Sequence, residues 1–439
     1  MKAFIQTLKN IYKIEELRTR ILFTLGILLV YRLCTVIVLP GIDPSGLAAL
    51  KSQTSEGIMG LLDMFSGGAF ANASIVALGI MPYITASILV QLLGIMIPSF
   101  QKMQREGESG RRKINQITRY LTVVILIFQG AAYLINLKQR SPAAFSPNFS
   151  VPLAVIILIA GTMFIMWLGE KITDKGIGTG ISLSIMIGII ARLPQALVQE
   201  FAVRLEGQGG GVALLVELVA WLIVIGLSVG LVQGTRKIPV QYAKRIVGNR
   251  QYGGVRQYIP LKVNAAGVMP IIFAQALMFI PVVLAGYASS DEKVSSFTSA
   301  FLNMHSFWYN LVFGLLIVAF TYFYTAITIN PNQMAEDMKR NGGFIPGVKP
   351  GKKTIEYLYE IMSRLVLPGS IFLALIAIFP TFAALLGIKG QFAQFFGGTT
   401  LLIMVGVVLD TLQQIESHLL MRHYDGLMKT GRIKGRSSI

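Results

Sequence analysis

Residue types that commonly carry out enzymatic chemistry are scarce in this chain of 439 residues. The single cysteine is Cys34, and the three histidines are His305, His418 and His423. This set provides neither a disulfide framework nor a cluster of metal ligands. The chain also lacks a GxxxxGK[ST] phosphate loop and a GxSxG turn, and Gly351–Thr354 does not fit the first spacing. We therefore expect no catalytic residue, no metal and no cofactor.

Charged residues within apolar stretches could still move ions or solutes. Glu217 and Asp410 lie near the ends of such stretches, where water can reach them, and Arg32 has no acid beside it in the sequence. A gradient-driven carrier usually has paired ionisable groups near the middle of the membrane. An intramembrane enzyme needs a nucleophile with an acid or metal ligands, which Cys34 or Asp410 alone cannot supply. We expect these residues to be structural.

The elements that position these residues are apolar helices. Hydrophobic residues make up 54% of the chain and charged residues 14%, whereas an ordinary soluble domain has about 25% charged residues. A bilayer core about 30 Å thick requires roughly 20 mainly apolar residues per helix. Such stretches recur along the whole sequence and predict an all-α integral membrane protein with ten transmembrane helices. The predicted spans are 21–40, 73–97, 119–138, 151–170, 177–197, 212–233, 264–286, 307–329, 364–387 and 398–416.

Lysine and arginine indicate the orientation of these spans. Most of the 39 basic residues fall in the N-terminal segment and in alternate loops, as is typical of cytoplasmic segments. We therefore predict a cytoplasmic N-terminal segment at 1–20 and a cytoplasmic tail at 417–439. The first 20 residues lack the apolar core and cleavage site of a signal peptide, so the first span is expected to start membrane insertion.

Ten spans divide into two halves of five helices, 21–197 and 212–416. An odd number of spans in each half makes the second half enter the membrane from the opposite side. We therefore expect an inverted repeat with a transport path between the halves. Ten helices without internal symmetry are the alternative. The glycine-containing segment 198–211 is expected to join the halves on the outer face as a hinge.

The stretch from Gly57 to Gly94 is too long for one helix and is interrupted by small and polar residues. Irregular backbone at membrane depth is tolerated only where protein or a water-filled cavity satisfies its hydrogen bonds. One interpretation is a short re-entrant segment at 58–70 that folds into a cavity. An ordinary external loop before the second span is the other.

Two long cytoplasmic loops, 234–263 and 330–363, are the main polar features. The first is rich in lysine and arginine and has no acid. Lipid headgroups could satisfy such a surface, but the length of the loop and its tyrosines favour docking to ribosomal RNA or an acidic protein. Glycines and prolines at 342–351 predict a shaped turn at the tip of the second loop.

Several short strings along the chain are characteristic of one family. They are Met64–Ala69, Ala77–Ile84, Glu106–Lys113, Gly161–Glu170, Tyr242–Arg245, Pro260–Asn264 and the tip segment that ends in Pro350–Gly351. Through these strings the chain resembles the SecY family over essentially its whole length. The resemblance implies an hourglass channel that conducts unfolded secretory proteins across a bacterial cytoplasmic (inner) membrane and releases signal sequences and membrane helices sideways into lipid.

The resemblance also implies a ring of apolar side chains at the waist of the channel. The ring is carried over onto Ile80, Ile84, Ile181, Ile185, Ile272 and Ile403. Two pairs are spaced i, i+4, which places each pair on one helix face. A narrow apolar constriction gates by dewetting, and branched side chains can part around an extended polypeptide. Without the resemblance, packing against lipid or other helices would be the default for these isoleucines.

Two further elements follow from the resemblance. A plug at about 58–72 would close the channel at rest, with Leu61, Phe65, Ser66, Gly67, Gly68 and Ala69 as its residues. A lateral gate would open between the second and third spans on one side and the seventh and eighth on the other. Gln91, Gln129 and Gln275 lie in three of these spans, where amides can hydrogen-bond across helices for roughly 0.6 to 2 kcal/mol each.

The partners implied by the resemblance are the small subunits SecE and SecG, the ATPase SecA, ribosomes, unfolded preproteins, signal peptides and membrane lipid, with accessory Sec subunits and an insertase as further candidates. ATP hydrolysis would belong to SecA. The residues expected to contact SecA or the ribosome are Lys244, Arg245, Arg250, Arg256 and Lys349. Lys349 departs from the arginine usual in the family, and a lysine cannot form the bidentate contact of an arginine.

An inverted-repeat secondary transporter of a small solute is the rival hypothesis, because it would share the ten spans and the broken helices. A carrier requires neither large basic loops nor an isoleucine ring. It does require a polar binding site at the middle of the membrane, and we find none in the sequence.

Overall fold

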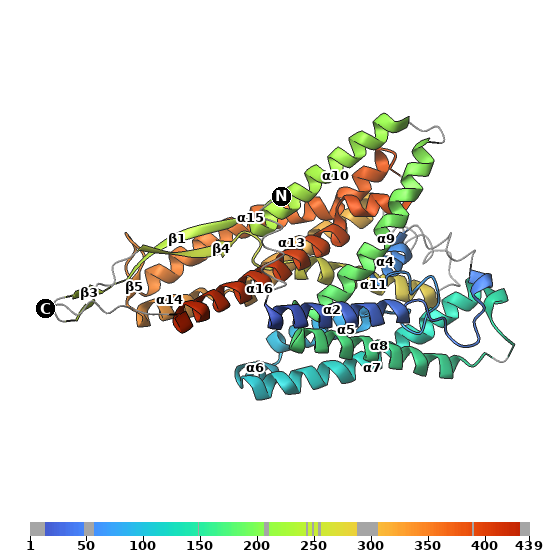
Figure 1. The fold of residues 1–439 in the computed structure, drawn as a ribbon, viewed down its shortest axis with the longest axis horizontal. Helices are drawn as coiled ribbons and strands as arrows, with labels where there is room; N and C mark the ends of the chain where they lie inside the picture. Colours follow the sequence, from blue (N-terminus) through green and yellow to red (C-terminus); the bar gives the residue numbers. More distant parts are fainter. Residues whose placement is uncertain are drawn as a thin grey trace. The chain divides into compact units, whose positions relative to one another are not determined.

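The computed structural model in Figure 1 describes residues 14–47, 57–147, 149–205, 210–242, 245–247, 250–252, 256–287, 306–388 and 390–430. Its α-helices are α2 (Glu15–Cys34), α4 (Gly57–Phe65), α5 (Met81–Met96), α6 (Pro98–Arg105), α7 (Glu108–Arg140), α8 (Val151–Lys175), α9 (Gly180–Leu205), α10 (Gly210–Gln233), α11 (Met269–Tyr287), α13 (Phe307–Thr328), α14 (Pro331–Arg340), α15 (Lys352–Leu385) and α16 (Gly398–Thr430). Its strands are β1 (Thr235–Tyr242), β2 (Arg245–Val247), β3 (Arg250–Tyr252), β4 (Arg256–Lys262) and β5 (Gly343–Phe344). Short 3₁₀ helices are η1 (Pro44–Leu47), η2 (Pro142–Ala144) and η3 (Gly390–Phe396).

Each of the ten predicted spans overlaps a helix, and the predicted helical membrane class is confirmed. Among the described residues, seven helices are long and apolar enough to cross a membrane. The number is eight if Met81–Gly94 and Pro98–Gln104, which are bent by 104° at their junction, form one span. Helices α2 and α11 overlap predicted spans but are not among these seven, so the count of ten spans stays a prediction.

Several helix boundaries differ from the predicted spans. The second predicted span starts at 73, but α5 begins only at Met81, because turns and positive φ angles at Ala73 and Gly79 interrupt the preceding backbone. Helix α9 continues through Pro194 to Leu205, into the segment predicted as a hinge. Helices α7, α15 and α16 extend beyond their apolar cores into polar sequence, which hydropathy alone assigns to loops.

The described residues group into two compact units. The first unit lies within Met1–Thr54, Leu61–Arg192 and Val407–Ile439, and the second within Ser55–Gly60 and Leu193–Gly406. This division is close to the predicted halves, except that the end of α16 groups with the first unit. The inverted relation between the halves stays a prediction.

In the first unit, α7 packs against α5 and α8, and α2 packs against α8. Arg119 of α7 forms an ion pair with Glu170 of α8 at 2.5 Å. The backbone N–H of Gly178, between α8 and α9, donates to Gln414 Oε1 at 2.8 Å, which attaches α16 to this unit. Val38 and Ser74 form an isolated antiparallel bridge, which pairs the end of the α2 segment with the chain entering α5.

In the second unit, α13 packs between α11 and α15, and α10 packs against α15. Their buried core includes Ile271, Phe313, Ile317 and Leu373. The indole N–H of Trp221 in α10 donates to the carbonyl of Phe395 at 2.9 Å, which attaches the η3 turn to this helix layer.

The two segments predicted as long cytoplasmic loops, 234–263 and 330–363, contribute the strands of one sheet, which the sequence did not predict. Strand β1 pairs antiparallel with β4, as in Ile238↔Ile259, and on its other edge with β5, as in Gln241↔Phe344. Figure 1 shows β1 and β4 running beside the start of α15. The core of this sheet module consists of Ile238, Val240, Leu261, Ala335, Met338, Ile345, Leu358 and Met362.

Candidate functional site

The segment 61–72, which follows the start of α4, is the most unusual part of the first unit. Helix α4 ends at Phe65, and Gly67 and Gly68 adopt φ angles of 66° and 93°, a region that glycine enters without steric cost. The N–H of Gly68 donates to the carbonyl of Asp63 at 2.8 Å, so the chain folds back at once. Residues 63–69 are all buried, as expected for irregular backbone enclosed by protein.

Asp63 is the polar centre of this segment, and its residue is only 2% exposed. Its Oδ1 accepts a hydrogen bond from the N–H of Ala71 at 2.8 Å, which closes the turn. Its Oδ2 forms an ion pair with the guanidinium of Arg192 in α9. A buried carboxylate is tolerated when its oxygens are hydrogen-bonded and a cation compensates its charge. The pair therefore attaches segment 61–72 to α9.

Close backbone packing adds a second attachment to α9. A Cβ atom at Gly188 would lie 2.7 Å from the carbonyl oxygen of Phe65 and 3.1 Å from the N–H nitrogen of Gly67. Both neighbours are backbone atoms, which cannot rotate away. Segment 61–72 therefore rests directly on α9 at Gly188.

Two other helices hold the segment through hydrogen bonds to its carbonyl groups. Arg32 of α2 donates through Nη1 to the carbonyl of Gly67 and also to Thr35 Oγ1 at 3.3 Å. The hydroxyl of Tyr133 in α7 donates to the carbonyl of Phe70 at 2.8 Å. Arg32 thus supports this turn.

Three of the six predicted ring isoleucines lie beside this segment. Ile80 is buried in a cluster with Ala69, Tyr31 and Val76, and Ile84 and Ile181 pack against it. Ile185 is also buried in the first unit. Ile403, which is buried, and Ile272, which is half-buried, belong to the second unit. The side chain of Leu61 lies outside the described residues.

The three predicted gate glutamines lie in different surroundings. Gln91 donates through Nε2 to Ser87 Oγ at 3.4 Å, within the same helix, and Gln129 is half-buried in α7. Gln275 in α11 is buried, and among the described residues its Oε1 has no hydrogen-bond partner. No hydrogen bond between these three glutamines is present among the described residues.

The predicted docking residues are described only in part. Arg245, Arg250 and Arg256 lie in strands β2, β3 and β4, with Arg245 opposite Tyr252, but their side chains lie outside the described set, as does all of Lys244. Lys349 is exposed in the turn between β5 and α15, and its carbonyl accepts from Thr354 Oγ1 at 3.0 Å. The sheet module therefore presents Lys349 on a shaped tip, as the glycines and prolines predicted.

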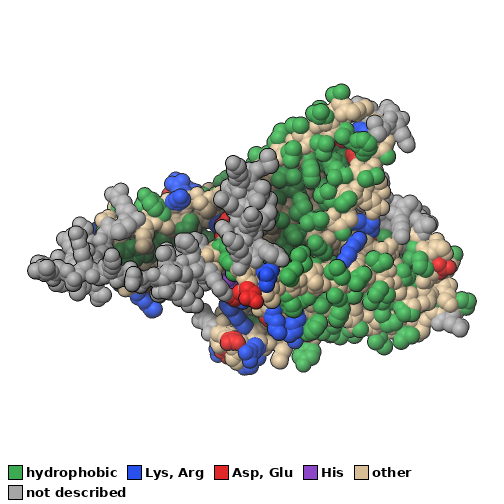
Figure 2. Space-filling model, in the orientation of Figure 1, with side chains coloured by type: hydrophobic (Ala, Val, Ile, Leu, Met, Phe, Trp, Pro, Cys, Tyr) green, Lys and Arg blue, Asp and Glu red, His purple; other side chains and the backbone are tan. Residues whose placement is uncertain are grey.

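Hydrophobic side chains are abundant on the surface as well as in the core. Figure 2 shows them over much of the visible face, with lysines and arginines in smaller groups. Large apolar residues such as Leu25 in α2 and Leu222 in α10 are more than half exposed. Together with the long apolar helices, this surface defines a multi-pass α-helical membrane protein that encloses an irregular buried segment.

Comparison with known proteins identifies the family. The SecY family model matches residues 74–412. The chain is 44% identical over 436 residues to "Protein translocase subunit SecY" of Streptomyces coelicolor, covering 95% of this chain and 98% of the relative. It is 42% identical over 454 residues to the Chlamydia trachomatis protein of the same name, covering 98% and 99%. The chain therefore belongs to the SecY family, which argues against the solute-carrier alternative.

Solved structures show the same fold at lower sequence identity. One, described as "The structure of a protein conducting channel", is 18% identical with a TM-score of 0.57, and 94% of each chain is covered. Another, Sec61 in a canine ribosome-channel complex from the endoplasmic reticulum, is 19% identical with a TM-score of 0.55 and the same coverage.

Sequence reasoning did not find two residues of this site, Asp63 and Arg192. A signal was present, because Asp63 is the only charged residue between Gly57 and Gly94, and Arg192 lies inside the predicted fifth span. An isolated acid and an isolated base in apolar segments are costly unless they meet. Pairing them from sequence required knowledge of which helix faces the segment.

Proposed function

We propose that this chain is the pore-forming subunit of a protein translocase in a bacterial cytoplasmic membrane, with both termini cytoplasmic. It conducts unfolded polypeptides across the membrane and releases signal sequences and apolar helices sideways into lipid. The observation that supports this best is the cluster in which Ala69 of segment 61–72 packs with Ile80, Ile84 and Ile181. A movable segment against a group of branched apolar side chains is the arrangement that a reversible seal requires.

In the proposed mechanism, segment 61–72 is the plug and the isoleucines form the constriction. Ile80, Ile84, Ile181 and Ile185 contribute from the first unit, and Ile272 and Ile403 contribute from the second. Water and ions avoid a narrow apolar passage because it cannot replace their hydration. An extended polypeptide displaces the plug, and the isoleucine side chains then part around it.

The plug must also return to its position after transport. The contacts of Asp63 with Arg192 and of Gly67 with Arg32 are directional, and a wrongly placed segment cannot satisfy them. Buried charges that lose their partners are costly. These contacts therefore define one resting position for the plug.

Lateral release requires a seam that opens to lipid. We propose that Gln91, Gln129 and Gln275 lie along this seam and that their amides help to hold it shut. Amide hydrogen bonds in membranes are worth roughly 0.6 to 2 kcal/mol each, which is enough to bias a seam while leaving it reversible. The buried Oε1 of Gln275, without a partner among the described residues, is available for such a bond.

Energy is supplied by partners that dock on the sheet module. We propose that the motor ATPase SecA and the ribosome contact Lys349 and the strand arginines, and that SecE and SecG complete the complex. A rigid antiparallel sheet with its own apolar core gives these charges fixed positions. Long-range attraction to acidic protein or RNA phosphates then guides docking.

Site-specific cross-linking tests the channel proposal. The chain is reconstituted with SecE and SecG in a Cys34→Ser background, so that a new cysteine is the only thiol. A preprotein arrested in transit should cross-link to Ile84→Cys and Ile403→Cys only when SecA and ATP are present. Leu222→Cys, whose native side chain is 63% exposed, is the lipid-facing control and should not react. Labelling of the control but never of the two isoleucine positions would refute the proposal.

A further inference from the structure

Helix α9 belongs to both compact units. The division between the units falls between Arg192 and Leu193, inside this helix, which is continuous from Gly180 to Leu205. We call residues 180–192 the first arm of α9 and residues 193–205 its second arm. Each arm makes its own contacts, and each can be described within its own unit.

The first arm is attached to the first unit near both of its ends. The N–H of Gly180 donates to Thr173 Oγ1 of α8 at 3.0 Å. Gly188 packs against the backbone of segment 61–72. Arg192, the last residue of the arm, forms an ion pair with the carboxylate of the same segment. The first arm is therefore fixed up to the division between the units.

The second arm is attached to the second unit by Arg204. This residue is 8% exposed, and its Nη2 forms an ion pair with Glu217 of α10. The same Nη2 donates to the carbonyl of Gly387, after α15, at 2.9 Å. Within the arm, Nε bonds to Glu200 Oε1 at 3.1 Å. One guanidinium therefore connects α9 with α10 and with the turn after α15.

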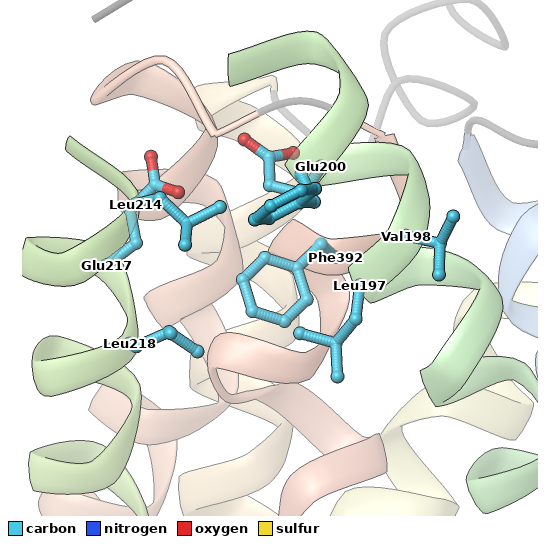
Figure 3. Close-up of a pocket in the computed structure, with 8 residues that line it drawn as sticks. Leu197, Val198, Glu200, Leu214, Glu217, Leu218 and Phe392 are labelled. Atoms are coloured by element: carbon cyan, nitrogen blue, oxygen red, sulfur yellow. The ribbon is translucent and has the colours of Figure 1, made fainter. Parts of the chain in front are cut away.

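Apolar side chains lie around the same junction. Figure 3 shows Leu197 of α9, Leu214 and Leu218 of α10 and Phe392 of η3 around one pocket, close to the two glutamates. The second arm, the start of α10 and η3 thus share one apolar environment, and the bonds of Arg204 give this group a defined geometry.

The ion pair of Arg204 with Glu217 bridges the segment 198–211, which its glycines predict as the hinge. Arg204 precedes these glycines in the sequence and Glu217 follows them. Bending at the glycines would separate the two side chains, and a buried charge that loses its partner is costly. The pair therefore opposes bending in the glycine segment.

Pro194 makes the junction of the two arms the weakest point of α9. Proline has no N–H, so the carbonyl of Ile190 loses its usual helical donor, and the proline ring crowds that carbonyl. Sharp helix kinks occur mostly at proline. Pro194 is exposed, so packing does not confine its ring. A bend of about 20° here would move the end of α9 at Leu205 by roughly 6 Å.

We propose that the two units bend relative to each other at Pro194, and that the bonds of Arg204 keep the glycine segment 198–211 out of this motion. The second arm then moves with α10 and η3. Helix α16 also crosses the division, between Gly406 and Val407. Glycine is the weakest helix former after proline, so α16 can follow the bend. The inference rests on the proposed function, because lateral release requires the two halves to part.

Distances between paired spin labels test the proposal. The chain, in a Cys34→Ser background, is purified with its partner subunits and placed in vesicles. The first pair, Ile156→Cys in α8 and Leu222→Cys in α10, spans the division between the units. The second pair, Val198→Cys in the second arm and Leu222→Cys, spans only the glycine segment. The native side chains at these positions are 62%, 63% and 68% exposed for Ile156, Leu222 and Val198, so the labels do not disturb the core.

We expect a broad distance distribution for the first pair and a narrow one for the second. Pro194→Ala restores the missing N–H donor and should narrow the first distribution without changing the second. Pro368→Ala is the matched control, because Pro368 is also an exposed proline inside a helix but lies within the second unit, and it should change neither. Glu217→Gln keeps the shape of the side chain but removes its charge, and it should broaden the second distribution.

An equally broad first distribution in Pro194→Ala and in the unsubstituted chain would overturn the proposal, as would an unchanged second distribution in Glu217→Gln. Thermal unfolding of each variant checks that the helices are intact.

A preprotein arrested with SecA and ATP extends the test to the working protein. It should shift the first distance by roughly 6 Å and leave the second unchanged. Shifts of equal size in both pairs would place the bend in the glycine segment and overturn the proposal. If neither distance shifts while Pro194→Ala still narrows the resting distribution, the hinge at Pro194 is supported and the proposed channel function fails.

Discussion

Asp63, in the turn that follows α4, forms a buried ion pair with Arg192 of α9, although the two residues are 129 positions apart in the sequence. Asp63 also accepts the N–H of Ala71, so one carboxylate both closes the turn and attaches it to a helix. In the proposed channel, this pair sets the balance between a seated and a displaced plug.

Replacing Asp63 with asparagine should therefore open the resting channel. The amide keeps the size of the side chain but leaves the half-buried Arg192 without its carboxylate. Breaking a fully buried pair costs about 3 to 5 kcal/mol, and the partial exposure of Arg192 lowers this cost. We expect a large rise in ion conductance across a planar bilayer without any preprotein, together with lower thermal stability. The exposed pair Arg112–Glu108 provides the control, because Glu108→Gln should change neither quantity.

The double variant Asp63→Asn, Arg192→Gln sharpens this test. It leaves no unpaired charge, so its conductance and stability should lie closer to those of the unsubstituted chain than either single variant does. A loss in the double variant equal to the sum of the losses in the two single variants would show that the residues do not act as a pair.

Gly188→Ala tests the close packing of the same segment. The added methyl group would meet the carbonyl of Phe65 and the N–H of Gly67, so the segment or α9 must move. We expect a leak similar to that of Asp63→Asn and faster modification of a cysteine placed at Ser66. Gly26→Ala in α2 is the matched control, because a Cβ there has no neighbour within 4 Å. It should change neither the resting conductance nor the modification rate at Ser66.

The sequence predicted the apolar helices but not the contacts between them, such as the one at Gly188. Hydropathy identified a helix at every predicted span because lipid imposes one local rule on each stretch. Contacts such as Gly188 with Phe65 depend on which helix packs against segment 61–72, and hydropathy along the sequence does not specify that. Family resemblance predicted a plug at about 58–72 and a ring of isoleucines, and both stay predictions. The charges that attach segment 61–72 to α9, Asp63 and Arg192, came only from the structure.

The sheet module was missed for a different reason. In β1 the side chains of Ile238 and Val240 point inward and alternate with exposed or polar neighbours, which is the period of a half-buried strand. The basic residues and tyrosines of this loop led to its interpretation as a docking surface, without a prediction of strands. Its third strand, β5, comes from a distant loop, so the sheet could not be assembled from local pattern alone.

Ile238→Ala should loosen this module without affecting the membrane helices. Ile238 is 2% exposed in the core of the sheet, and truncating a buried isoleucine typically costs about 2 to 5 kcal/mol. We expect faster cleavage of the β1–β4 hairpin by protease and weaker binding of SecA, with the resting conductance unchanged. Lys237→Ala alters the exposed neighbour on the same strand and should keep its protease resistance.

The charge and shape of residue 349 should affect SecA binding and SecA-dependent export. Lys349→Arg supplies a planar guanidinium that can form two parallel hydrogen bonds to a carboxylate, so we expect SecA affinity to be retained or raised. Lys349→Glu reverses the charge at the exposed tip and should lower SecA-dependent export by about tenfold or more. Lys339→Glu, exposed on α14, makes the same charge change away from the tip and should have a much smaller effect. Equal losses from both variants would indicate a general charge effect on docking.

Gln275→Leu separates the cost of a buried amide from its proposed role at the lateral gate. The Gln275 side chain is buried in α11 with Oε1 unpartnered among the described residues, so an apolar replacement of similar size should leave the resting protein as stable or more stable. If the amide helps to hold the gate shut, the same change removes a hydrogen bond that signal sequences must compete with. Export of a reporter with a defective signal sequence should then rise, while export of a reporter with an intact signal stays constant. The control is Gln91→Leu, because the amide of Gln91 already bonds to Ser87 within its own helix. This change should raise export of the defective reporter less than Gln275→Leu does. Unchanged export of the defective reporter in Gln275→Leu, in protein whose thermal stability is at least as high as before, would remove Gln275 from the gate.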